Sequence, residues 1–377
     1  MYYAYQVIIL HVLEPFASGI TTAVSSIARE LPEYTHIVIH GSRNWTESAG
    51  NVKQRFPEGV SFVEWKHAGR EISPANDFKA LLELMEILKP YTPQKNTNPL
   101  AVHLHSSKAG FLGRLACRLL GIKAVIYTPH CGAFLRTDIS PMKQNLYYFF
   151  EWLGGKFGGR VVGCGKSEGE IYKKLGKNTT YVSNGVAVKG EEGISTEQTE
   201  RNLVSFSGIA SFQKAPAFWS RVAGECADCA REAGFSFCWI GDGPGAEALK
   251  TEYITITGWK AADEVEKLLE KTAVYFSASA WEGLPYGVLE AMSSGCALLL
   301  RNIPGNRELV VPGENGRLFN TEDEAKDFLA AMIKDRDLLS AMGRRSREII
   351  GQGFTLKQMG DGYRQIYSAC HNGAKID

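Results

Sequence analysis

Short apolar runs rich in strand-forming residues recur along the first half of the chain, and stretches with helical spacing separate them. The runs are Gln6–Val12, His36–His40, Val60–Trp65, Ala101–His105, Ala124–Thr128 and Val161–Cys164. Strands that alternate with helices build a parallel sheet whose faces the helices cover. The pattern therefore predicts an α/β domain over residues 1–188.

A second set of strand-like runs follows the polar stretch Lys189–Arg201, whose charge and low apolar content are typical of an interdomain linker. The runs are Leu203–Ser207, Ser236–Ile240, Tyr253–Thr257, Ala273–Ser277 and Ala297–Arg301. Each is nearly continuous in apolar residues, which is typical of strands buried on both faces. We therefore expect a second α/β domain over residues 189–353, similar to the first.

The loops that follow the predicted strands are the expected place for function. Doubly wound sheets bind ligands outside the carboxyl ends of their strands, where the loops into the next helices gather. Two such sheets facing each other would form a cleft lined by both sets of loops.

Charge and composition narrow the class of protein. The chain has 377 residues, with 42 Lys and Arg against 41 Asp and Glu. Such a balance creates no general attraction for nucleic acid, so the composition disfavours nucleic acid and we expect none as a partner. No apolar run reaches the roughly 18 residues needed to cross a bilayer. Met1–Val12 resembles a first strand rather than a signal peptide, so we expect a cytoplasmic protein.

The cysteines fit a reducing compartment. There are eight, and they are scattered along the chain. The one close pair, Cys226 and Cys229, lies in a helical stretch over Trp219–Ala233 and lacks a second pair with zinc-type spacing. We therefore interpret these two cysteines as structural.

The segment after the strand at Ala273–Ser279 contains the most informative loop. It runs through Glu282-Gly-Leu-Pro-Tyr286 into a helix. Backbone amides at a helix N-terminus can hold an anion such as a pyrophosphate. Glu282 in the loop and Glu290 in the second helical turn could hold hydroxyls of two parts of one ligand. Considered singly, each is explained as well by a surface charge.

The order of motifs resembles one enzyme family. Glu282-x₇-Glu290, then Ala-Met-Ser-Ser-Gly-Cys-Ala and the run Ile303–Gly316, closely resembles the C-terminal half of the family 4 glycosyltransferases, which are retaining enzymes. The resemblance implies the GT-B fold, in which two Rossmann-like doubly wound domains face each other across a cleft. It also implies that a last helix, at about residues 354–377, crosses back onto the first domain.

The resemblance places the nucleotide-sugar donor mainly on the second domain. It puts Glu290 on the ribose, the amides of the helix at Tyr286 on the diphosphate, and Glu282 on the transferred sugar. The other donor-binding residues of this segment are Gly283, Leu284, Pro285 and Gly287.

Two glycine-containing loops are similar to the family's donor loops. Gly208 begins a loop that ends at Lys214, which the resemblance places on the diphosphate, where it can neutralise the leaving group. The arginine common after this glycine is replaced by Ile209. The turn Gly241, Asp242 and Gly243 corresponds to the turn below the nucleotide, where glycine allows close backbone approach.

The first half carries weaker signals. Gly19 follows the first strand where the family has a phosphate-contacting glycine loop, although a simple helix-capping turn at Ser18 is the alternative. His130 ends a strand, and the resemblance places it near the transferred sugar. His103 and His105 alternate with apolar residues, and we expect one to face the core and the other the cleft edge.

The implied function is a retaining hexosyltransferase that moves a UDP- or GDP-linked sugar to a glycan or lipid-linked acceptor in surface polysaccharide assembly. The catalytic residues would be His130, Lys214 and Glu282. No Asp-x-Asp motif follows a predicted strand, so we expect no metal cofactor. Retention could use a carboxylate nucleophile or same-face attack assisted by the leaving phosphate, and the resemblance favours the second.

Two other functions and one membrane role stay open. A sugar-nucleotide epimerase could have the same architecture, and Ile209 favours a non-catalytic nucleotide-sugar-binding protein. The aromatic run Tyr147–Phe150 with Trp152 is either a patch that contacts the inner face of the membrane or a buried helix face.

Overall fold

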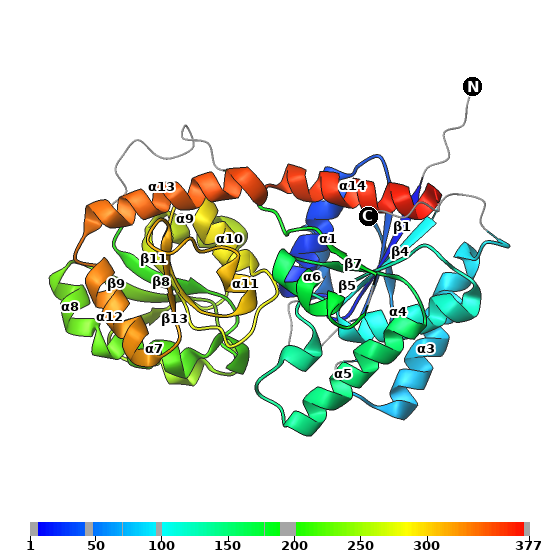
Figure 1. The fold of residues 1–377 in the computed structure, drawn as a ribbon, viewed down its shortest axis with the longest axis horizontal. Helices are drawn as coiled ribbons and strands as arrows, with labels where there is room; N and C mark the ends of the chain where they lie inside the picture. The colour runs from blue at the N-terminus through cyan, green and yellow to red at the C-terminus, as the bar shows by residue number, and fades with distance from the viewer. Residues whose placement is uncertain are drawn as a thin grey trace. The chain divides into compact units, whose positions relative to one another are not determined.

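The computed structural model describes residues 7–41, 48–69, 71–95, 100–176, 178–188 and 201–372. It divides into two compact units (Figure 1). The N-terminal unit comprises Met1–Leu135, Ile139–Gly185 and Leu356–Asp377, and the C-terminal unit comprises Arg136–Asp138 and Val186–Thr355. Apart from Arg201, the predicted linker lies outside the described residues.

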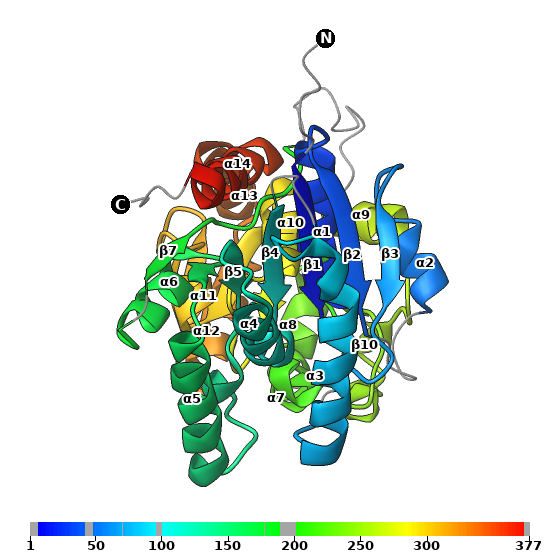
Figure 2. The ribbon, with the colours of Figure 1, turned by 90° about the vertical axis from the view of Figure 1, so that its right-hand side faces the viewer.

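The N-terminal unit is built on a seven-stranded sheet in the order β3-β2-β1-β4-β5-β6-β7, as far as the described residues go. Every neighbouring pair is parallel (Figure 2). The strands are β1 (Ile8–Leu13), β2 (Thr35–His40), β3 (Ser61–Glu64), β4 (Leu100–His105), β5 (Val125–Thr128), β6 (Arg160–Gly163) and β7 (Thr179–Tyr181).

Helices cover both faces of this sheet. They are α1 (Ser18–Glu30), α2 (Ala49–Lys53), α3 (Pro74–Leu88), α4 (Ser107–Leu120), α5 (Pro141–Lys156), α6 (Lys166–Lys173) and α14 (Leu356–Asn372). Apolar side chains of α1 and α14 pack on one face, and those of α3 and α4 pack on the other. Burial on both faces explains why most residues of the central strands are apolar, although β1, β2 and β4 also contain histidines.

The C-terminal unit has a second parallel sheet, six-stranded within the described residues, in the order β10-β9-β8-β11-β12-β13. Its strands are β8 (Leu203–Ser207), β9 (Ser236–Ile240), β10 (Ile254–Ile256), β11 (Thr272–Ser277), β12 (Ala297–Arg301) and β13 (Gly316–Phe319). The prediction of a doubly wound α/β fold is confirmed.

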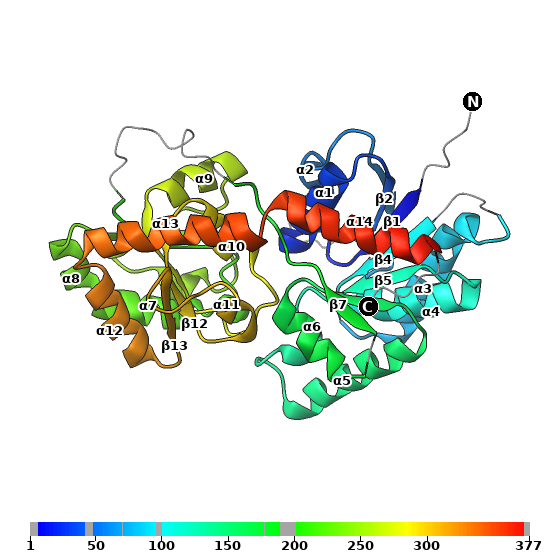
Figure 3. The same cartoon turned by 45° about the horizontal axis from the view of Figure 1, so that its top comes forward.

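The helices of the C-terminal unit are α7 (Pro216–Glu225), α8 (Ala227–Glu232), α9 (Ala262–Glu270), α10 (Tyr286–Ser293), α11 (Pro304–Arg307), α12 (Glu322–Met332) and α13 (Arg336–Gly353). Figure 3 shows α13 lying along α10, and the two helices are in contact. The chain then continues into α14, which belongs to the N-terminal unit.

The predicted helical stretch over Trp219–Ala233 is helical but interrupted at Cys226. The stretch Trp219–Ala233 is two helices, because Cys226 leaves helical geometry at φ −98° and ψ 1°. The Cys226 thiol lies 3.7 Å from the carbonyl of Lys326 in α12, a tertiary contact that helical spacing does not reveal. Both Cys226 and Cys229 are free thiols.

Each sheet has a topological switch point. In the N-terminal sheet the chain runs from β1 outward to β3 and then returns to place β4 on the other side of β1. In the C-terminal sheet it runs from β8 to β10 and then places β11 on the other side of β8. Ligands of doubly wound sheets bind at such points, so the loops after these strands position the site. No helix among the described residues has the length and apolar character to cross a membrane.

Candidate active site

Lys214 and Glu282 meet at the switch point of the C-terminal sheet. Lys214 ends the short helix η4 (Phe212–Lys214) after β8, and Glu282 lies in the loop between β11 and α10. The Lys214 ammonium donates to Oε1 of Glu282. The side chains of Lys214 and Glu282 are 21% and 8% exposed, so the pair is largely shielded from water.

Gln213 ties these two loops together. Its backbone carbonyl accepts a hydrogen bond from the Ala280 amide at 2.7 Å. Its side-chain amide donates to the Trp281 carbonyl at 2.8 Å and to Oε2 of Glu282 at 3.4 Å. Gln213 could not be predicted from the sequence, because a glutamine in a loop has no periodicity or motif of its own.

The Gly241–Gly243 turn packs directly against the loop that begins at Gly208. Gly241 has φ 135°, and a Cβ there would lie 2.4 Å from the Gly208 carbonyl oxygen. The Ala210 amide donates to the Asp242 carbonyl at 2.9 Å. The Asp242 carboxylate accepts from the Gly243 amide at 2.7 Å. The two loops therefore form one rigid backbone surface that side chains would disrupt.

The start of α10 is held by backbone contacts on one side. A Cβ on Gly305, in α11, would lie 1.9 Å from the carbonyl oxygen of Gly283. On the other side, a Cβ on Gly287 would lie 2.7 Å from the Tyr275 hydroxyl. The segment that contains Leu284, Pro285 and Tyr286 is therefore fixed at the carboxyl edge of the sheet, where the positive end of the α10 dipole favours an anion.

Glu290 is a partly buried carboxyl on the second turn of α10. Burial raises its pKa to about 7, and the negative charge of Glu266 adds to the shift. Among the described residues no ion pair to Glu290 is present, and a shielded carboxyl of this kind is suited to receive hydroxyl donors from a ligand.

Gly19 lies in the first turn of α1, after β1. The alternative of a side-chain cap by Ser18 is wrong, since the N-cap is Ala17 and no side chain caps the helix. Ser18 instead adopts φ 57° inside the first turn.

His130 follows β5 in a strained turn. His130 and Cys131 have φ 52° and 75°, which is unfavourable for residues other than glycine. Glu168 holds the turn by accepting hydrogen bonds from the amides of Cys131 at 2.5 Å and Cys164 at 2.8 Å. Burial lowers the pKa of His130 to about 3, so its imidazole is neutral.

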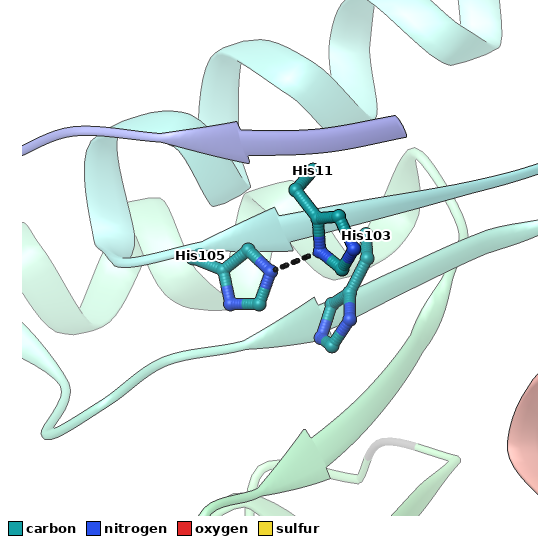
Figure 4. A group of neighbouring side chains, drawn as sticks. All are labelled: His11, His103 and His105. Atoms are coloured by element: carbon teal, nitrogen blue, oxygen red, sulfur yellow. Dashed lines mark hydrogen bonds between the residues drawn. The ribbon is translucent and has the colours of Figure 1, made fainter. Parts of the chain in front are cut away.

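The expectation that His103 and His105 point in different directions is wrong. Residues two apart on a strand face the same side, and both rings are fully buried with centroids 3.9 Å apart. His11 from β1 joins them (Figure 4). These three are the one group of potential metal ligands found among the described residues.

Hydrogen bonds account for every ring nitrogen of this group. His103 is hydrogen-bonded to Tyr367 and to Thr128, each at 2.8 Å. His11 and His105 are hydrogen-bonded to each other at 3.2 Å and to further histidines at their other nitrogens. The cluster is therefore satisfied without a metal ion.

The predicted site residues fall into two groups. Lys214, Glu282, Glu290 and the donor-loop glycines gather at one edge of the C-terminal sheet. Gly19 and His130 both follow strands of the N-terminal sheet.

Family models match both halves of the chain. Residues 18–185 match the model described as glycosyl transferase 4-like domain. Residues 201–335 match the model described as glycosyl transferases group 1. The two matches follow the order of the two structural units and together cover most of the described residues.

A curated relative and two solved structures agree with these models. The chain is 29% identical over 323 residues to an Escherichia coli UDP-Gal:alpha-D-GlcNAc-diphosphoundecaprenol alpha-1,3-galactosyltransferase, covering 79% of this chain and 81% of the relative. Sucrose-phosphate synthase from Thermosynechococcus elongatus has a TM-score of 0.75 at 16% identity, covering 97% of this chain and 100% of that one. Anabaena Alr3699/HepE in complex with UDP-glucose has a TM-score of 0.74 at 14% identity, covering 96% of this chain and 99% of that one.

The fold, the order of the donor-loop motifs and the two family models point to the same class of enzyme. This chain belongs to the family 4-type glycosyltransferases with the GT-B fold.

Proposed function

We propose that this enzyme transfers a hexose from a UDP-linked donor to a lipid-linked saccharide, with retention of the anomeric configuration and without a metal ion. The observation that carries the proposal is the pairing of Lys214 with Glu282 at the switch point of the C-terminal sheet. The Escherichia coli relative is named for a UDP-Gal donor and a diphosphoundecaprenol-linked acceptor, which supports both substrate classes.

The donor diphosphate binds between Lys214 and the start of α10. An ammonium group has three N–H donors. Lys214 can therefore keep its hydrogen bond to Glu282 and give its other donors to phosphate oxygens. The α10 N-terminus adds a positive potential to the same region. Glu290, one turn further along α10, accepts hydrogen bonds from the ribose hydroxyls.

Transfer proceeds by same-face attack in this proposal. The bond between the anomeric carbon and the diphosphate oxygen breaks, and the acceptor oxygen forms a bond to the same face of that carbon. The acceptor proton passes to the leaving phosphate oxygen. Lys214 stabilises the negative charge that develops on the diphosphate. Glu282, held by Gln213 and Lys214, orients the transferred sugar through its hydroxyls. For the N-terminal unit taken by itself, His130 is proposed as a group that accepts a hydrogen bond from a sugar hydroxyl.

Metal independence is supported by the cationic side chain already placed for the leaving group. In metal-dependent transfer a divalent ion neutralises the diphosphate, and Lys214 with the α10 dipole performs that task here. The rate should be unchanged after EDTA treatment and exhaustive dialysis. A rate that is lost and then restored by Mg²⁺ or Mn²⁺ alone would contradict this part of the proposal.

Helix α5 is proposed to contact the membrane that holds a lipid-linked acceptor. Its Tyr148, Phe149 and Trp152 are exposed, and the Phe149 and Trp152 rings stack with centroids 5.9 Å apart. The ammonium of Lys156 lies 5.1 Å from the centroid of the Trp152 ring. Aromatic rings with nearby lysines are typical of surfaces that bind anionic lipid.

Sedimentation with vesicles tests this contact. The wild type should bind vesicles that contain anionic phosphatidylglycerol more strongly than neutral ones. A Phe149→Ser, Trp152→Ser variant should lose most of that binding and keep its activity on a water-soluble acceptor analogue. Equal vesicle binding by both proteins would remove α5 from the proposal.

Product analysis with a labelled donor tests the reaction itself. With UDP-galactose or UDP-glucose and a lipid-diphosphate saccharide, label should appear in the acceptor and UDP should be released in equal amount. The comparisons favour transfer over an epimerase and over non-catalytic binding. An epimerase would change the labelled sugar with no acceptor present, and a binding protein would release no UDP.

A further inference from the structure

A continuous chain of hydrogen bonds between imidazole rings runs through the N-terminal unit. Nδ1 of His36 lies 3.1 Å from Nε2 of His11. Nδ1 of His11 lies 3.2 Å from Nε2 of His105. Nδ1 of His105 lies 3.0 Å from Nε2 of His130. The rings come from β2, β1, β4 and the end of β5, which are successive neighbours in the sheet, so the chain ends at a proposed site residue.

At the His36 end of this series of hydrogen bonds, the donor and the acceptor are fixed. Nε2 of His36 lies 2.9 Å from the carbonyl oxygen of Leu31. A carbonyl oxygen can only accept, so this nitrogen must carry the proton. Leu31 is the C-cap of α1, where the negative end of the helix dipole further favours an N–H group.

The position of the proton on His36 determines which nitrogen is protonated in each of the following rings. A neutral imidazole has one N–H and one bare nitrogen. His36, protonated on Nε2, presents a bare Nδ1 to His11, which must then donate from its own Nε2. His105 donates to His11 in the same way. His130 donates from Nε2 to the bare Nδ1 of His105, so the Nδ1 of His130 is left without a proton.

The rings are neutral, as this argument requires. Burial is the main cause that lowers the pKa of His11 and His105 well below the usual value, and neighbouring histidines add to the effect. Burial also lowers the pKa of His36 and takes that of His130 to about 3. Within the described part of the chain, no group forms a hydrogen bond with Nδ1 of His130, which is only partly buried.

We propose that His36, His11 and His105 are positioning residues that hold His130 in its Nε2–H tautomer, so that Nδ1 accepts a hydrogen bond from a hydroxyl of the transferred sugar. The contact with the sugar rests on the proposed function, whereas the tautomer is a property of the free protein. His36 and His11 do not contact His130 directly, and they influence its tautomer only through the hydrogen bonds of the rings between them.

The hydrogen bond from His36 to the Leu31 carbonyl determines the tautomers of the other rings, because each inner ring could otherwise be protonated on either nitrogen. Without an acceptor at His36, the chain from His11 to His130 can reverse all its hydrogen bonds at once. His130 would then carry its proton on Nδ1 and would repel a hydroxyl hydrogen. Two variants separate these cases: His36→Leu removes the acceptor for His11, and His36→Asn places an oxygen near the position of the lost Nδ1.

Nitrogen-15 NMR of the free enzyme, labelled at its histidines, measures the tautomer directly. In the wild type and in His36→Asn, His130 should show a bare Nδ1 and a protonated Nε2. In His36→Leu the His130 signals should shift toward the other tautomer. A wild-type His130 protonated on Nδ1, or a His36→Leu spectrum unchanged at His130, would overturn the proposal.

Steady-state kinetics provide the second readout. If reversal leaves only a fraction of molecules with the competent tautomer, His36→Leu should lower kcat/KM about two- to tenfold. His36→Asn should restore it, and the melting temperatures of the two variants should match within a few degrees. Loss of activity in both variants with equal folding would show that the ring of His36, not its acceptor, matters and would overturn the relay.

Two further outcomes distinguish this inference from its alternatives. A correct tautomer together with full activity of His130→Ala would leave the relay intact and remove the sugar contact from the proposed function. One equivalent of tightly bound zinc in the purified enzyme, lost in His11→Asn and His103→Asn, would instead assign the cluster to a metal and overturn the relay.

Discussion

Among the proposed donor-site residues of the described part of the chain, Glu290 has a strongly raised pKa. Its carboxyl lies on α10, and burial with the nearby charge of Glu266 raises its pKa to about 7. That arrangement costs stability when the group is ionised, as expected for a residue that serves a ligand rather than the fold.

Donor binding should depend on pH through Glu290. A carboxylate accepts from both ribose hydroxyls only when it is deprotonated, so binding should be strongest above about pH 8 and weaken toward tenfold per pH unit below about pH 6. Isothermal titration of UDP-glucose measures this, because its diphosphate does not titrate in that range. Glu290→Gln should bind weakly at every pH. A wild-type Kd that is constant from pH 6 to 8.5 would contradict the ribose assignment.

The same substitution should stabilise the free enzyme. The pKa of Glu290 is higher in the folded state than its ordinary value of 4.5, so the folded protein holds the proton more tightly. The ionised group therefore destabilises the fold increasingly between these two pKa values and fully above the higher one. Glu290→Gln should raise the free energy of unfolding at pH 8 by roughly 1–3 kcal/mol. Urea denaturation at pH 5 and pH 8 should show the gain mainly at pH 8.

Lys214 should matter for rate more than for folding. Its ammonium group forms an ion pair with Glu282, and its charge is proposed to stabilise the leaving diphosphate. Lys214→Ala should lower kcat by about 10²- to 10³-fold. Lys214→Arg is the control that keeps the charge, and it should lose much less. Should the Ala variant unfold at the growth temperature by circular dichroism, the residue would have to be regarded as structural.

At the residue level, site residues that stand in sequence motifs could be predicted, whereas residues whose role depends on tertiary contacts could not. Lys214, Glu282 and Glu290 stand in ordered motifs, so it could be predicted that Lys214 and Glu282 lie in loops after strands and Glu290 on the following helix. Gln213 and the histidine chain could not, since their partners lie on strands or loops distant in sequence. The separate roles expected for His103 and His105 were an error about strand periodicity.

Helix α10 shows how neighbouring elements create the donor loop. Gly305 of α11 lies against the backbone of the Glu282–Pro285 loop, so the loop can occupy its position only because that residue has no side chain. The glycine was visible in the motif Ile303–Gly316. Its role depends on the contact between α11 and the donor loop, which the motif does not reveal.

Gly305→Ala should displace the donor loop. The added Cβ would lie 1.9 Å from the Gly283 carbonyl oxygen, so the loop must shift, with an expected loss of about tenfold or more in kcat/KM and about 1–3 kcal/mol in stability. Gly351→Ala is the matched control, since a Cβ there meets nothing within 4 Å. Equal activity of the two variants would show that the loop position is not critical.

Among the elements, the strands that stand in apolar runs were predictable, and β7 and β13, the last strand of each sheet along the chain, were not. β8, β9 and β12 match their predicted bounds. β7 and β13 have three and four residues at the edges of their sheets and lack a continuous apolar run. Their pairing depends on the neighbouring strand, which local sequence does not encode.

On the scale of the whole molecule, two doubly wound units each place their candidate residues after strands beside a switch point. The sequence predicted this architecture because alternating strands and helices permit few other arrangements. The identity of the sugar and the acceptor could not be predicted, since these depend on the shapes of loops rather than on motifs.

The anomeric configuration of the first product tests the central claim most directly. Proton NMR of the reaction between an α-linked UDP-sugar and a lipid-diphosphate saccharide analogue reports it through the coupling constant of the transferred sugar. We predict an α-linked product that forms with wild type, without added metal, and at least about a hundredfold more slowly with Lys214→Ala. A β-linked product, or a changed sugar nucleotide with no transfer, would contradict the account.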